Sequence, residues 1–142
     1  MRASRFRATR VEKVAPLRLG RLMLRALTAP GQIPGAQAVH VRLPAGCGHD
    51  EVVHRRTKEW FLVLRGTGRG RIDGRAVSFR PGVAVYMPPG VPHRMRAGSS
   101  ALEALAIFSP PLAPGRPGAD LHPVRRRRAA ARRRIDRRGK RG

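Results

Sequence analysis

Short apolar segments, separated by glycine and proline, run along most of this 142-residue chain. Val39, Val41 and Leu43 alternate with more polar residues, and this period of two predicts a half-buried β-strand. Several other segments have a similar length and are bounded by similar turn residues. Many short strands with turns between them are typical of an all-β domain.

The segment that follows Glu59 is apolar without interruption for five residues. Such a run is typical of a strand that is covered on both faces. Glu59, Phe61 and Val63 share one face of this strand, because successive side chains alternate between faces. Trp60 lies on the other face, and we expect Trp60 and Phe79 to lie in the core.

Turn signals divide the rest of the chain into further strands. Asp73 and Gly74 predict a two-residue hairpin, because a type I′ turn needs positive φ at both positions. We expect one strand over Leu17–Leu27, ending at the turn-rich residues 29–31, and a final strand over Leu102–Phe108. The sequence thus predicts seven to nine short strands and no helix. A jelly-roll sandwich or barrel is the natural closure for such a set of strands.

Composition and charge define one folded domain with two basic extensions. The 16 glycines and 13 prolines fit the many turns, and the single Cys47 excludes an intramolecular disulfide. We predict a basic arm over residues 1–16, a barrel over residues 17–113, and a Pro/Gly linker with an Arg-rich tail over residues 114–142. No apolar run approaches the ~18 residues of a membrane helix, so we expect a cytoplasmic protein without membrane contact.

The tail contains the densest charge of a chain whose net charge is +23. Residues 119–142 hold eleven basic and two acidic residues, a net charge of +9. Like-charge blocks of this kind repel one another, which favours a disordered, solubilising tail. The alternative is salt-sensitive binding to nucleic acid without sequence specificity. No aromatic residues lie among the arginines of the tail to stack on bases.

Two histidines and one glutamate are the candidate metal ligands of the chain. His54 and Glu59 lie five residues apart near the start of the apolar strand, and His93 follows a Pro-Pro-Gly corner downstream. Imidazole and carboxylate groups together suit first-row transition metals. A buried carboxylate without a partner is costly, so the inward position of Glu59 favours a functional site.

These residues lie in two segments, each of which begins with a glycine and has a defined spacing. The first segment has glycine, five residues, valine, one residue, histidine, four residues, glutamate, six residues and glycine, at Gly46, Val52, His54, Glu59 and Gly66. The second has glycine, five residues, proline, one residue, glycine, two residues and histidine, at Gly82, Pro88, Gly90 and His93.

In these two segments the chain resembles the cupins, small double-stranded β-helix barrels whose two motifs form a metal site at the barrel centre. The resemblance covers about residues 36–112. Val52 stands where the first motif usually has a histidine, and Ala97 stands where the second usually has an asparagine. An alternative alignment takes His54 as the first histidine and Arg56 as the lost second, with the interval to Glu59 one residue too short.

The resemblance implies a divalent first-row metal, such as Fe, Mn, Ni or Zn, held by His54, Glu59 and His93. Two imidazoles and one carboxylate are also the composition of the facial triad of non-haem iron enzymes. The family implies a metal-dependent dioxygenase- or isomerase-type enzyme acting on a small organic or sugar-like ligand. A small-molecule binder or sensor without turnover is the alternative, as is a basic nucleic-acid-associated protein.

Other residues near the motifs receive structural interpretations, with three alternatives left open. His49 lies near the predicted barrel mouth, where it would contact a ligand or replace the missing imidazole. Tyr86 and Met95 would either line the pocket or pack in the core. The remaining assignments are structural: surface or linker positions for His40 and His122, and a loop or packing role for Cys47.

We also expect a homodimer. The resemblance implies pairing through outer strands of the barrel. The Leu17–Leu27 segment offers apolar residues beyond those that one small barrel covers.

Overall fold

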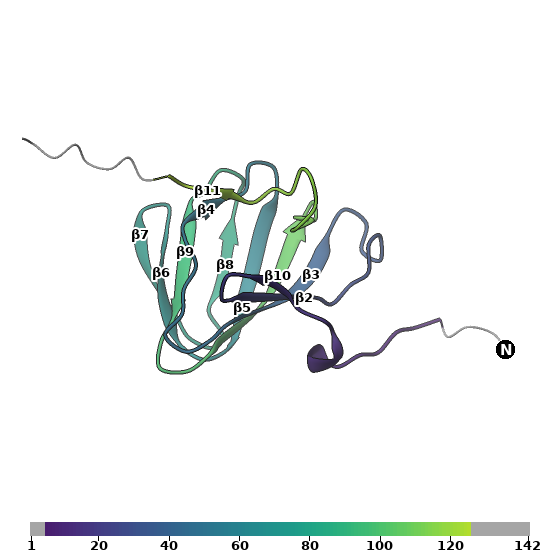
Figure 1. Ribbon diagram of the computed structural model, residues 1–142, viewed down its shortest axis with the longest axis horizontal. Helices are drawn as coiled ribbons and strands as arrows, with labels where there is room; N and C mark the ends of the chain where they lie inside the picture. Colours follow the sequence, from purple (N-terminus) through teal and green to yellow (C-terminus); the bar gives the residue numbers. More distant parts are fainter. Residues whose placement is uncertain (1–4, 126–142) are drawn as a thin grey trace, which may run out of the picture.

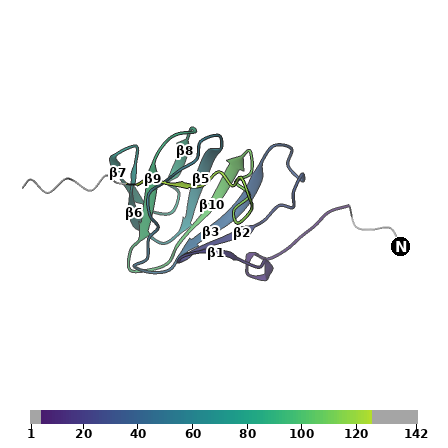
Figure 2. The ribbon, with the colours of Figure 1, turned by 45° about the horizontal axis from the view of Figure 1, so that its top comes forward.

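The computed structural model describes residues 5–125 and contains two antiparallel sheets that face each other (Figures 1 and 2). It confirms the predicted all-β, jelly-roll barrel. The described residues form eleven strands rather than seven to nine, because two strands are only two residues long and one predicted strand is a hairpin. Their helical structure is limited to a 3₁₀ turn over Val11–Lys13.

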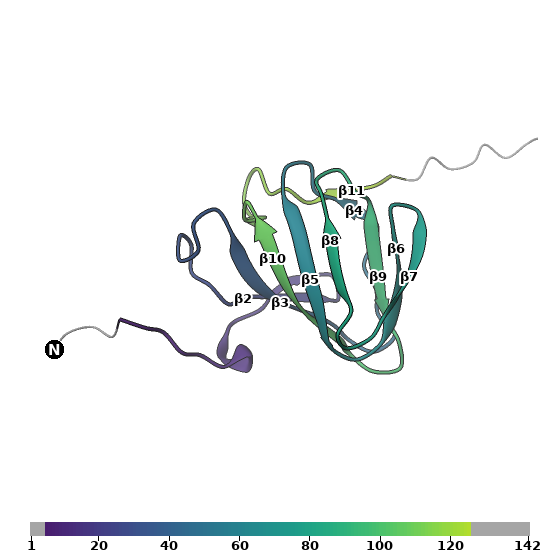
Figure 3. The same ribbon diagram turned by 180° about the vertical axis from the view of Figure 1, so that it is seen from behind.

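The larger sheet has six strands, and the smaller has five. In the order β1-β2-β3-β10-β5-β8, the larger sheet contains Leu17–Leu19, Leu22–Ala26, Gln37–Leu43, Leu102–Ser109, Lys58–Arg65 and Ala84–Met87. In the order β11-β4-β9-β6-β7, the smaller sheet contains His122–Pro123, Val52–Val53, His93–Ala97, Gly68–Ile72 and Arg75–Phe79. Figure 3 shows β10, β5 and β8 side by side on one wall of the barrel.

The core fills the space between the two sheets. Burial alternates along β10, and the buried parity points inward. The inward residues of the larger sheet and those of the smaller sheet form one apolar cluster, which includes Leu43, Phe61, Val63, Phe79, Leu102, Ala106 and Phe108. Phe79 is therefore in the core, as predicted.

The outer face of β5 corrects the prediction for Trp60. Its side chain is 37% exposed and lies beside Tyr86 of β8, which is 59% exposed. An unbroken apolar run predicted cover on both faces of this strand, but the described residues leave Trp60 and Leu64 open to solvent. Tyr86 likewise neither lines the barrel cavity nor packs in the core.

The predicted strand over Leu17–Leu27 is in fact a hairpin. β1 and β2 pair antiparallel, with Leu19 opposite Leu22. Gly20 adopts a φ of 59° in the two-residue turn. The leucines before and after this turn lie on two different strands, so they do not follow a single period. The other predicted hairpin is confirmed, because Asp73 and Gly74 have φ values of 51° and 75° between β6 and β7.

His40 is buried, which makes its predicted surface position wrong. It lies on the outer parity of β3, where Nε2 is 3.1 Å from Oε1 of Glu103 on β10. Within the described residues, its Nδ1 has no hydrogen-bond partner. The N-terminal turn explains the burial, because Val11 and Glu12 line the same surface pocket as His40.

Burial lowers the pKa of His40 below its ordinary value, although Glu103 partly opposes this shift. The unfolded chain therefore binds a proton at this position more readily than the folded chain. The free energy of unfolding should therefore fall as the pH drops through 6.5, the ordinary pKa of histidine. We predict that His40→Gln makes the free energy of unfolding less dependent on pH between about 7.5 and 5.5. Urea titrations at several pH values would show this, and equal slopes would contradict it.

The described residues contain no helix that is long and apolar enough to span a bilayer. The Arg-rich part of the predicted tail begins at Arg125, and all of it beyond that residue lies outside the described residues. The segment from residue 114 to residue 125 is described, and it packs against the barrel end where β11 pairs with β4 (Figure 1).

Candidate metal centre

Three elements bring the candidate ligands together inside the barrel. His54 follows β4 directly, Glu59 is the second residue of β5, and His93 begins β9. Val52 of β4 pairs with His93, so it lies beside the site as predicted. One ligand atom from each of His54, Glu59 and His93 falls within 4.8 Å of the other two. The three residues therefore converge, as the motif spacing predicts.

The carboxylate of Glu59 lies between the two imidazoles. Its Oε2 is 3.1 Å from Nε2 of His54 and 3.4 Å from Nε2 of His93. The two rings have centroids 4.9 Å apart. All three side chains are buried, so the desolvation of the carboxylate is offset by these two neighbours or by a bound cation.

Backbone carbonyls orient both imidazoles. Nδ1–H of His54 donates to the Asp120 carbonyl at 2.7 Å, and Nδ1–H of His93 donates to the Val91 carbonyl at 3.0 Å. Because Nδ1 holds the proton in each ring, Nε2 of the neutral ring presents its lone pair to the centre. Metal-binding histidines show this arrangement, in which the second nitrogen donates to a carbonyl or carboxylate.

The two histidines differ in their preferred charge. Burial lowers the pKa of His54, but the hydrogen bond and charge of Glu59 outweigh burial and raise this pKa above its ordinary value. Burial lowers the pKa of His93, with Glu59 only partly opposing the shift. In the absence of a cation, His54 is therefore more readily protonated than His93.

Asp120 fixes the loop that positions His54. Its carboxylate accepts three backbone hydrogen bonds, from the N–H groups of Arg55, Arg56 and Thr57, at 2.7 to 2.8 Å. Burial by itself raises the pKa of Asp120, but these donors more than offset that effect and lower the pKa below its ordinary range. The same residue therefore holds the His54 loop with its side chain and the His54 ring with its carbonyl.

Sequence reasoning missed Asp120, because the Pro/Gly composition around it indicates a linker. The residue is 3% exposed and lies outside the motif-bearing region. One signal was available, since Asp120 is the only acid between residues 104 and 135 of a strongly basic chain. The packing continues past this residue, because the Val124 N–H donates to the Glu51 carbonyl at 2.8 Å.

A cavity of about 490 Å³ adjoins the three ligands. Its volume falls in the range of about 300–1,000 Å³ that is usual for small-molecule sites. Apolar residues form most of its wall, including Leu19, Leu22, Val41, Val52, Phe61, Met95, Phe108 and Leu121. Met95 therefore lines the cavity, which was one of the two interpretations left open for it.

His49 also lines this cavity but is not one of the converging ligands. Its ring centroid is 6.2 Å from that of His93, and its Nδ1 lies 2.7 Å from the Asp50 carbonyl. His49 therefore borders the ligand cavity without replacing the missing imidazole. Val52 pairs with His93 beside the centre, whereas Arg56 is exposed. The structure therefore favours the motif alignment that places Val52, rather than Arg56, at the position of the missing histidine.

The donor set fits a divalent first-row transition metal. Two Nε2 atoms and a carboxylate oxygen face one point, and both imidazoles have the outer hydrogen bonds that orient metal ligands. Three protein ligands leave coordination positions for other molecules. His54, Glu59 and His93 are thus the residues that would hold the metal.

The fold and the two motifs define a cupin, and comparison with protein families agrees. A family model described as a cupin domain matches residues 39–108. The chain belongs to the cupin superfamily. A search of curated proteins found no match.

Solved structures share the fold at low sequence identity. A predicted oxalate decarboxylase from Thermotoga maritima is 19% identical, with a TM-score of 0.66 over 74% of this chain and 100% of that one. Ectoine synthase from P. lautus is 16% identical, with a TM-score of 0.68 over 89% and 95%. A Streptomyces protein solved with uridine is 20% identical, with a TM-score of 0.66 over 86% and 92%. Identities this low establish the fold alone.

Proposed function

We propose that this protein is a metal-dependent enzyme that acts on a small organic or sugar-like molecule inside the barrel, with dioxygenase- or isomerase-type chemistry. The observation that supports the proposal is the convergence of His54, Glu59 and His93 at the wall of a largely apolar cavity. Such a cavity with a few convergent polar groups is the usual form of a small-molecule site.

The chain's own residues would bind the ligand and exclude water from the centre. A bound divalent metal supplies a Lewis acid with open positions for oxygen atoms of the ligand. Glu59 reduces the net charge of the centre, while the two carbonyl-anchored imidazoles keep their Nε2 atoms directed at it. Phe61, Met95 and the other apolar residues of the cavity would contact the carbon skeleton of the substrate.

Binding without turnover is the second candidate function. Val52 in place of the usual first histidine favours it, because a three-ligand centre leaves one more position open to water. A small molecule that binds in a metal-dependent manner, yet is recovered unchanged after long incubation with oxygen present, would support a sensor. Consumption of the molecule would support the enzyme.

The metal centre makes a direct prediction. His93→Ala should reduce metal bound per chain by at least about tenfold, because one of only three protein ligands is lost. His49→Ala is the matched control, since it removes a neighbouring imidazole that does not converge on the centre. Elemental analysis after equal metal loading would compare the two variants.

Circular dichroism of both variants would establish that the barrel is folded, and His93→Gln offers a less disruptive replacement. Unchanged metal in a folded His93 variant would overturn the assignment. Equal losses in the His93 and His49 variants would also contradict it.

Two further predictions concern partners. The homodimer stays a prediction, and the exposed Trp60, Leu64 and Tyr86 are apolar residues that a second chain would cover. Binding of nucleic acid by the Arg-rich tail also stays a prediction, because nearly all of that segment lies outside the described residues.

A further inference from the structure

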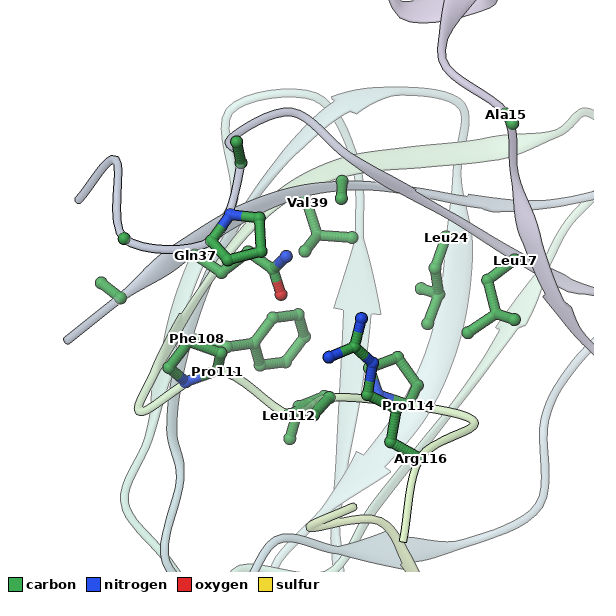
Figure 4. A pocket seen from close by; sticks show the side chains of 16 residues that line it. Ala15, Leu17, Leu24, Gln37, Val39, Phe108, Pro111, Leu112, Pro114 and Arg116 are labelled. Carbon is green, nitrogen blue, oxygen red and sulfur yellow. The ribbon is translucent and has the colours of Figure 1, made fainter. Parts of the chain in front are cut away.

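A second cavity lies beside the one that contains the metal ligands. It has a volume of about 420 Å³, within the range of small-molecule sites. The start of β3, the end of β10 and the segment that follows β10 form its wall (Figure 4). Leu17 and Ala15 from the N-terminal side close another part of it. Neither the predicted ligands nor His49 lines this second cavity.

Only two of the sixteen residues that line the second cavity have polar side chains, so these two decide its chemistry. They are Gln37 and Arg116. Figure 4 shows the amide of Gln37 and the guanidinium of Arg116 directed towards the space between Val39, Leu24 and Phe108. Within residues 5–125, neither side chain has a hydrogen-bond or ion-pair partner.

The cavity therefore combines an apolar wall with an unpaired positive charge. No acidic side chain lines it. Arg116 is an exposed residue, so its guanidinium is accessible to an anion that enters the cavity. Its planar N–H groups match the two oxygens of a carboxylate, while the Gln37 amide provides one further donor.

We propose that this cavity is a second ligand site, which binds a small monocarboxylate with an aliphatic body. The carboxylate pairs with Arg116 and Gln37, and the aliphatic chain packs against Leu24, Val39 and Phe108. The positive charge of the whole chain assists the approach of such an anion.

The second site is separate from the candidate metal centre but shares a wall with it. Leu24, Phe108 and Leu112 line both cavities. The ring of Phe108 also contacts the ring of His54 edge-on, with centroids 5.9 Å apart. A carboxylate in the second cavity therefore lies one side chain away from the metal ligands, without touching them.

Calorimetric titration of the full chain with hexanoate tests the proposal. The protein is treated with EDTA, so that carboxylate binding to a metal does not contribute, and physiological salt suppresses loose binding to arginines that have no apolar cavity beside them. We expect saturable, equimolar binding of hexanoate. Acetate should bind at least about tenfold more weakly because it lacks four methylene groups. Hexanol should bind at least about tenfold more weakly because it lacks the charge.

Arg116→Gln localises the site, and Arg75→Gln is its matched control because Arg75 is an exposed arginine on the far hairpin. We expect the Arg116 variant to bind hexanoate at least about tenfold more weakly and the Arg75 variant to bind it as the wild type does. Absence of saturable binding would overturn the proposal, as would equal affinities in all three proteins. Because the protein is metal-free in this experiment, its result is independent of the proposed metal function.

Discussion

Asp120→Ala should lower the free energy of unfolding by about 3–5 kcal/mol, because three backbone donors, one buried and two part-buried, lose a charged acceptor. These donors are the N–H groups of residues 55–57, which connect β4 to β5. The loop also positions His54, so the variant should bind metal more weakly even where it is folded. Urea denaturation and elemental analysis would measure the two effects.

Two further variants separate the causes of this effect. Asp120→Asn keeps the size and one acceptor oxygen, so it should fall between the wild type and the alanine variant. Asp50→Ala is the control, because the exposed Asp50 carboxylate forms no hydrogen bond or ion pair within residues 5–125. This variant should change the free energy of unfolding by no more than about 0.5 kcal/mol. A stable Asp120→Ala protein would show that the segment after β10 does not fix the loop.

Gly66→Ala should destabilise the barrel by more than about 3 kcal/mol. Gly66 has a φ of 78°, and a Cβ added to it would lie 1.9 Å from the carbonyl oxygen of Ala101. That oxygen belongs to the backbone immediately before β10. Neither backbone segment can therefore move without disturbing the pairing of β5 with β10. Thermal and urea unfolding would measure the loss.

Gly46→Ala is a matched control for this prediction. Gly46 has a similar φ of 69°, but no atom lies within 4 Å of an added Cβ. Its substitution should cause only the backbone strain of the left-handed region, about 1–2 kcal/mol. Equal effects of the two substitutions would contradict this prediction. They would mean that φ alone, and not the close approach of the backbone, requires glycine at residue 66.

The motifs predicted the barrel and the converging ligands because both depend on local spacing. A strand pair joined by a short turn fixes which face a side chain occupies, so His54, Glu59 and His93 could be placed from the sequence. The sequence also shows that Ala97 and Val52 stand where the family motifs usually have asparagine and histidine. Local spacing also predicted the turn at Asp73 and Gly74, because its backbone conformation restricts which residues occupy it.

The errors concern contacts between distant parts of the chain. Alternation assigns residues to two faces of a strand but does not say what covers the second face. Trp60 was therefore placed in the core although its face is open, and His40 was placed at the surface although the N-terminal turn covers it. Asp120 is 63 to 65 residues from the backbone groups that it binds, and no local pattern reports such a contact.

The metal content of freshly purified protein tests the central claim most directly. We predict close to one divalent first-row metal ion per chain, removed by EDTA and restored by dialysis against the same metal. The Glu59→Gln variant, folded and treated in the same way, should retain little metal, because it lacks the anionic ligand between the two imidazoles. A wild-type barrel that neither contains nor takes up a divalent metal would contradict the assignment of His54, Glu59 and His93 as a metal centre.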